Sequence, residues 1–180
     1  MKFLILVSCF LFITVTSKSQ SADECKYLMI LTYLRTNTQI NEQIKGLFSR
    51  IKITKVKDKY VEFNLSNRID FLNIYDFKEE LNSKNIEISK ELINEPKLYS
   101  KNFFFESFRS EFLKNIMQQN DSKLFLTFSK PVDNYLVAII GNSNPELTGT
   151  FRMGLGMKMF FKFNSAGLIE DVLYSSAAYN

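Results

Sequence analysis

The sequence predicts an α+β domain in which amphipathic helices pack on one face of a mainly antiparallel sheet. Helical periodicity recurs through the first two thirds of the chain, whereas the last third alternates apolar and polar residues as strands do. No linker, repeat or low-complexity tract divides the 180 residues, of which 46% are apolar and 18 are phenylalanine. We therefore expect one domain with a substantial core.

The N-terminus has the pattern of a signal peptide. Lys2 precedes the apolar run Phe3–Val15, and small residues stand at positions −3 and −1 of a cut after Ser19. The apolar run is too short to cross a bilayer comfortably. We expect residues 1–19 to be removed and residues 20–180 to form a single exported domain, periplasmic or extracellular, with no stable membrane span after cleavage.

Two other fates of the N-terminus stay open. If the site after Ser19 is not cleaved, the segment 1–19 would act as a membrane anchor. In addition, Leu6–Cys9 resembles the box that precedes an acylated cysteine, although it lies inside the apolar run rather than after it.

Cleavage after Ser19 leaves one cysteine and a nearly balanced charge. Cys25 then has no partner for an internal disulfide. We interpret it as a small apolar contact, with a reactive thiol or an intermolecular bridge as alternatives. Lys2 and Lys18 are lost with the leader, which leaves 21 basic and 19 acidic residues. This small net charge predicts no nucleic-acid partner.

Two helices are expected at the start of the exported domain. Ser21 and Glu24 have the spacing of a capping box, and the helix that they begin is expected over Ala22–Arg35. A second helix is expected to follow, capped by Thr38. Both carry an apolar stripe that should face the core: Tyr27, Leu28, Ile30, Leu31 and Leu34 in the first, and Ile40, Ile44, Leu47 and Phe48 in the second.

Residues 50–65 change to a period of two and predict a β-hairpin with a turn at Lys57–Lys59. This is the most basic stretch of the chain. We interpret its lysines as protection of an edge strand against pairing with other chains. A patch for an anionic surface or polysaccharide is the alternative, but interleaved aromatic residues are absent from the run.

A third helix is expected over residues 71–81. Asp70 would cap it, and Ile74, Phe77 and Leu81 would form its buried face. Residues 86–98 fit either a short strand or one to two helical turns.

The principal helix is expected over residues 103–119, capped by Asn102. Phe104, Phe108, Phe112 and Ile116 recur there at every fourth position. A phenylalanine stripe at this spacing is typical of a core-facing helix surface, so we expect this helix to lie on the final sheet.

The last third predicts an antiparallel meander of three or four strands. The expected strands are Lys123–Phe128, Tyr135–Ile140, Met157–Phe163 and Leu168–Tyr174. The second is apolar at every position, which predicts a central strand covered on both faces. Residues 141–156 stay unassigned. They contain Gly149–Gly154, the glycine spacing of a phosphate-binding loop, but the lysine that must follow is replaced by Leu155.

No residue is predicted to be catalytic, cofactor-binding or metal-binding. The chain has no histidine, which removes Ser-His-Asp and Cys-His catalysis and histidine-bearing zinc sites. The acidic pairs Glu79-Glu80 and Glu170-Asp171 have the chemistry for acid–base catalysis, but each is expected to point in two directions. Asn64 and Asn120 begin glycosylation triplets, which matter only in a eukaryotic secretory route. We therefore expect no enzyme and no cofactor.

The element order resembles that of the cone-shaped cystatin-like class, in which a curved sheet wraps a helix, and this resemblance implies no activity. We expect an exported, non-catalytic bacterial protein with a structural role or a role in binding a macromolecule, either a protein or a cell-envelope component. The alternative is a carrier of a small apolar ligand, with a pocket between the sheet and the helix at 103–119. An exported hydrolase is a third hypothesis.

Overall fold

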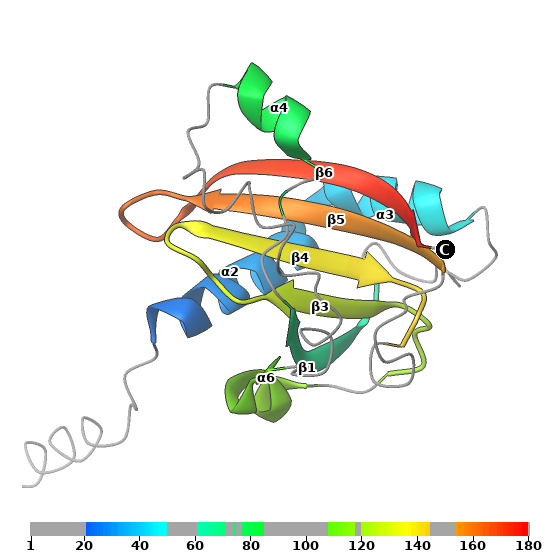
Figure 1. Cartoon of the computed structure of the whole chain (residues 1–180). Helices are drawn as coiled ribbons and strands as arrows, with labels where there is room; N and C mark the ends of the chain where they lie inside the picture. The colour runs from blue at the N-terminus through cyan, green and yellow to red at the C-terminus, as the bar shows by residue number, and fades with distance from the viewer. Residues whose placement is uncertain are drawn as a thin grey trace, which may run out of the picture.

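The structure, a computed structural model, describes residues 21–49, 61–70, 74, 77–84, 108–117, 120–144 and 154–179. It has the predicted α+β fold (Figure 1). The elements in chain order are α2 (Ala22–Thr36), α3 (Thr38–Ser49), β1 (Asn64–Asp70), α4 (Lys78–Ser83), β2 (Phe108–Arg109), α6 (Glu111–Ile116), β3 (Phe125–Ser129), β4 (Tyr135–Gly141), β5 (Gly154–Phe163) and β6 (Ile169–Tyr179).

The strands form one sheet in the order β2-β1-β3-β4-β5-β6. Strands β3 to β6 follow one another in the sequence and pair antiparallel, which confirms the predicted C-terminal meander. In contrast, β1 pairs parallel with β3, with Asn64 opposite Phe125, and the short β2 pairs antiparallel with β1. The long edge of the sheet is therefore β6, and the short edge is β2.

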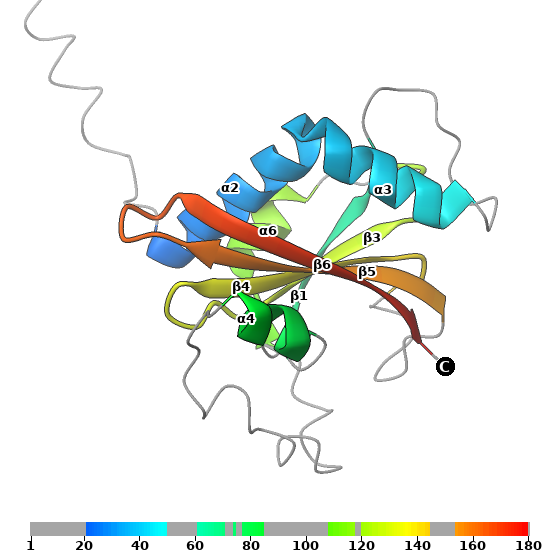
Figure 2. The same ribbon diagram turned by 90° about the horizontal axis from the view of Figure 1, so that it is seen from above.

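Helices α2 and α3 lie against one face of the sheet (Figure 2). The predicted capping box is confirmed, because the Ser21 hydroxyl accepts from the Glu24 amide and the Ser21 amide donates to the Glu24 carboxylate. The cap of α3 differs from the expectation, since the Asn37 side chain, not Thr38, accepts from the Ile40 amide at 3.0 Å. The apolar stripes of both helices join one core cluster with the inward residues of β3, β4 and β5.

A smaller cluster occupies the opposite face of the sheet. Ile74, Phe77 and Leu81 pack there against Val137, Phe160 and Leu173. The burial of these three residues agrees with the prediction, but of the helix predicted over 71–81 only the part from Lys78 is confirmed, and Asp70 as its cap was wrong. Asp70 instead ends β1, where it pairs with Ser129, and the helix α4 begins only at Lys78.

The principal helix predicted over residues 103–119 was also wrong. Phe108 and Arg109 are extended and pair with Ile69 and Arg68 of β1. A separate short helix, α6, starts after Ser110, whose hydroxyl accepts from the Leu113 amide at 3.1 Å. An N-cap residue has an extended backbone, so a single helix cannot continue through it.

The basic hairpin predicted at residues 50–65 is only partly covered by the structure. Its first strand and turn lie outside the described residues. The second strand begins at Asn64 rather than Val61 and pairs with β3 and β2 within the described ranges. Residues 86–98 and most of the unassigned loop at 141–156 also lie outside them.

Candidate functional site

An open groove runs along the flank of α2 beside the start of β6. It has a volume of about 480 Å³ and is open to solvent. The lining residues are Cys25, Leu28, Met29, Thr32, Tyr33 and Thr36 of α2, and Ile169 of β6. From Cys25 to Thr36 the helix rises roughly 16 Å, so the groove is elongated rather than round.

The spacing of apolar residues in α2 produces this groove. Tyr27, Ile30, Leu31 and Leu34 are buried against the sheet. Leu28, Met29 and Tyr33 lie beside them on the next stripe of the helix and only partly reach the core. The helix therefore carries more apolar surface than the sheet covers, and the remainder faces the groove.

The polar groups in the groove are turned back onto the helix. The Thr32 hydroxyl donates to the Leu28 carbonyl, and the Thr36 hydroxyl donates to the Thr32 carbonyl, each at 2.9 Å. These bonds satisfy the hydroxyl protons and leave a largely apolar surface for a ligand.

Tyr33 connects the groove to the core. Its ring meets Phe161 edge to face, with centroids 5.7 Å apart. Burial, with a smaller contribution from Tyr174, raises the pKa of the Tyr33 phenol, whereas a hydrogen bond with Asn37 opposes the rise. The phenol is therefore neutral at physiological pH and adds no charge to the groove.

Cys25 lies at the N-terminal end of the groove. Its side chain is exposed, and it forms no disulfide within the described residues. The thiol thus contributes to an accessible surface, not to the buried core, which refines the expectation of a small apolar contact.

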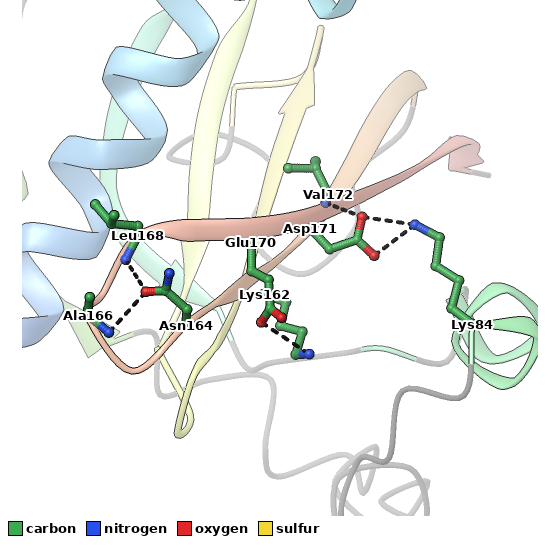
Figure 3. Close-up of polar contacts among 8 residues, drawn as sticks. All are labelled: Lys84, Lys162, Asn164, Ala166, Leu168, Glu170, Asp171 and Val172. Carbon is green, nitrogen blue, oxygen red and sulfur yellow. Dashed lines mark hydrogen bonds and ion pairs between the residues drawn. The ribbon is translucent and has the colours of Figure 1, made fainter.

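The acidic pair at the start of β6 does not form a shared site. The Glu170 carboxylate lies 3.1 Å from the Lys162 ammonium, and the Asp171 carboxylate lies 2.7 Å from the Lys84 ammonium (Figure 3). Each carboxylate thus has its own lysine. The other predicted pair, Glu79-Glu80, lies on the exposed side of α4. Neither pair is brought together around a common point.

The two glycosylation triplets meet in space. The Asn64 amide nitrogen donates to the Ser122 carbonyl at 2.7 Å, and the Asn120 amide nitrogen donates to the Phe63 carbonyl at 3.1 Å. The Asn64 side-chain oxygen also accepts from the Asn120 backbone at 2.8 Å. These asparagines tie the start of β1 to the segment before β3, and a glycan on either nitrogen would break that connection.

Sequence reasoning assigned the whole apolar stripe of α2 to the core and so missed the groove. The available signal was the width of the stripe, because Leu28, Met29 and Tyr33 extend it beyond what one packed face needs. The sequence does not specify that β6 begins beside this helix.

Within the ranges that the structure covers, no three acidic or cysteine side chains gather in a way that could hold a metal ion. None of the helices in those ranges has the length and apolarity needed to cross a membrane. No family model, curated protein or solved structure matches this chain.

Proposed function

We propose that this is an exported, non-catalytic bacterial protein that binds another exported protein through the groove beside α2. The observation that carries the proposal is the character of the groove, which is open, elongated and apolar, with its threonine hydroxyls bonded to the helix. An extended or helical segment of a partner that presents apolar side chains fits this shape and chemistry.

A carrier of a small apolar ligand is the second candidate. The groove volume of about 480 Å³ falls in the usual range for small-molecule sites. However, such sites bury most of the ligand and orient it with a few polar groups. Here the groove is open, and its hydroxyls bond within the helix, which favours a macromolecule. In addition, the pocket for such a ligand was predicted between the sheet and a helix over residues 103–119, and these residues do not form one helix.

The absence of catalysis remains part of the proposal. The sequence offers no histidine, and the acidic pair in β6 is divided between two lysines. Neither feature supports general acid–base chemistry of the kind that a hydrolase needs.

Site-specific photo-crosslinking in the exported fraction tests the proposed contact. A benzophenone amino acid at Thr32 would lie in the groove, whereas the same probe at Gln39 would lie on the exposed side of α3. We expect one discrete protein adduct from position 32 only. Adding Met29→Lys to the position-32 chain should remove the adduct, because a charge in the groove opposes apolar contact.

The outcomes separate the two candidates. Equal adducts from positions 32 and 39, or none, would contradict the groove as a protein-binding site. Native mass spectrometry of the purified protein then decides the alternative: a bound small molecule in the unmodified chain that is absent from Met29→Lys would favour the carrier. A cell-envelope lipid or glycan crosslinked at position 32 would show that the binding partner is an envelope component and not a protein.

A further inference from the structure

We propose that two copies of this chain pair edge to edge through β6, antiparallel and with the two-fold axis at Tyr174, so that their sheets join into one. This inference concerns the edge of β6, which adjoins the groove at Ile169, and it does not depend on the proposed function. The chemistry is that of strand addition, in which backbone amides and carbonyls of one edge pair with those of another.

β6 is an edge strand, and α4 lies beside its start through the ion pair of Lys84 with Asp171. β6 is the last strand in the sheet order, and within the described residues no strand pairs with its outer side. Figure 1 shows β6 along one edge of the sheet, and Figure 2 looks onto that edge. Its length of 11 residues contrasts with the 2 residues of β2 at the opposite edge. The short edge offers little for pairing, whereas the long edge offers a row of backbone groups.

The sequence of β6 lacks the usual protection of an edge strand. The segment Ile169–Tyr179 contains no lysine, arginine or proline. Its two charged residues stand at its start, and Lys162 and Lys84 neutralise them at 3.1 and 2.7 Å. The electrostatic repulsion between the β6 strands of two copies is therefore small.

The strand is also complementary to itself. Tyr174 is the midpoint of β6, so an antiparallel pair centred there uses the whole strand. In this register Leu173 stands opposite Ser175, and Val172 opposite Ser176. The acidic residues Glu170 and Asp171 stand opposite Ala178 and Ala177, so no like charges meet, and Ile169 stands opposite Tyr179 at the ends of the pair.

The residue on the proposed axis has the properties of an interface anchor. Tyr174 is 46% exposed, and Leu168 is the other large apolar residue of the described ranges with comparable exposure. The Gln43 side chain of α3 donates to the Tyr174 hydroxyl at 2.6 Å, which holds the ring in place before any partner arrives. A preordered, exposed tyrosine is a frequent centre of binding energy in interfaces.

The mass in solution is the first test. Light scattering after size exclusion should give twice the mass of one chain for the unmodified mature protein. Tyr174→Lys should give the mass of one chain, because two ammonium groups would face each other on the axis. Leu168→Lys adds the same charge at an exposed apolar residue just outside β6 and should remain a dimer.

A symmetric crosslink tests the register. In a Cys25→Ser background, Tyr174→Cys should form an intermolecular disulfide with oxidised glutathione, which accepts the two electrons from the thiols. Directly opposed residues of antiparallel strands have Cα atoms about 4.5–5.5 Å apart, within disulfide reach. Ser176→Cys is the control, since its two copies would lie four residues apart along the strands, roughly 14 Å, and should not crosslink.

Several results would overturn the proposal. A single-chain mass at all protein concentrations would do so, as would a dimer that survives Tyr174→Lys with an unchanged circular dichroism spectrum. Equal crosslinking of the Ser176→Cys and Tyr174→Cys variants would reject the register. If Tyr174→Lys does not fold, the crosslinking comparison decides alone.

Discussion

Asn41 shows how one buried amide fixes the arrangement of three chain segments. It is 1% exposed. Its side-chain nitrogen donates to the carbonyls of Leu34 and Asn37, each at 2.7 Å, and its oxygen accepts from the Val61 amide at 2.8 Å. The amide therefore holds the end of α2, the turn into α3 and the approach to β1. Removing an amide whose nitrogen and oxygen are both hydrogen-bonded lowers stability, because its partners stay buried without a hydrogen bond.

Replacing Asn41 by Ala should lower the free energy of unfolding by about 2–4 kcal/mol, since the Val61 amide and two carbonyls lose their partner. Gln39→Ala, on the exposed side of the same helix, should stay within about 0.5 kcal/mol. Urea melts of the two variants and the unmodified protein measure both values. Equal stability of the two variants would show that water replaces the amide without cost.

Tyr27 links stability to pH in the alkaline range. Its side chain is 4% exposed, and its hydroxyl donates to the Ser129 carbonyl at 3.4 Å. Burial, with a smaller contribution from the Asp23 carboxylate, raises the pKa of the phenol well above its ordinary value of 10.0. The folded protein thus holds the proton more tightly than the unfolded chain does. The stability from neutral Tyr27 is complete below pH 10 and is lost as the pH rises from there toward the folded-state pKa.

We therefore expect the free energy of unfolding of the unmodified protein to fall as the pH rises above about 10. The fall should be less steep for Tyr27→Phe, which keeps the ring against Phe128 but cannot ionise. Urea melts at intervals across this range give both slopes. Identical slopes would mean that Tyr27 does not contribute to the alkaline loss of stability.

At the scale of elements, local signals were sufficient for some segments and not for others. The capping box at Ser21, the continuous apolar run in β4 and the alternation in β5 are complete within a few residues, so α2 and the meander were predicted correctly. The parallel pairing of Asn64 with Phe125 joins residues far apart in the sequence, and no local pattern encodes it.

Tertiary pairing that no local pattern encodes also explains why the prediction of one helix over residues 103–119 was wrong. Phe108 and Phe112 have helical spacing, but tertiary pairing of β2 with β1 takes Phe108 into a strand, and Ser110 restarts the helix. The candidate groove was missed for a related cause. Its apolar residues were visible in α2, whereas the neighbour that completes it, Ile169, comes from the other end of the chain.

The short helix α6 offers a test at this scale. Leu113 is fully buried in the main core cluster, whereas Lys114 is exposed beside Glu111. Leu113→Ala should cost about 2–5 kcal/mol, because it removes a packed side chain and leaves a cavity. Lys114→Ala should change stability by less than about 0.5 kcal/mol. Chemical denaturation separates the two. A loss below about 1 kcal/mol for Leu113→Ala would show that α6 is only loosely attached to the core.

The whole molecule is built around β4, which is apolar on both faces. Leu136, Ala138 and Ile140 face the helices α2 and α3, and Val137 faces the cluster that contains Leu81. This two-sided cover agrees with the continuous apolar run from Tyr135 to Ile140, which predicted a central strand. The sheet therefore has a centre that is covered on both faces, at β4.

The last prediction concerns where the mature chain begins. A cut after Ser19 leaves Gln20 as the first residue and keeps Ser21, whose amide and hydroxyl both bond to Glu24. A cut beyond Ser21 would remove this cap, which typically contributes about 0.5–2 kcal/mol. N-terminal sequencing of protein from the exported fraction should thus begin at or near Gln20. Ser19→Phe should block processing, because a large residue at position −1 does not fit the cleavage pattern. Ser21→Ala should be processed normally but melt at a lower temperature, since it loses only the cap. Recovery of protein that begins at Met1 from the exported fraction would refute the signal peptide and favour the uncleaved anchor.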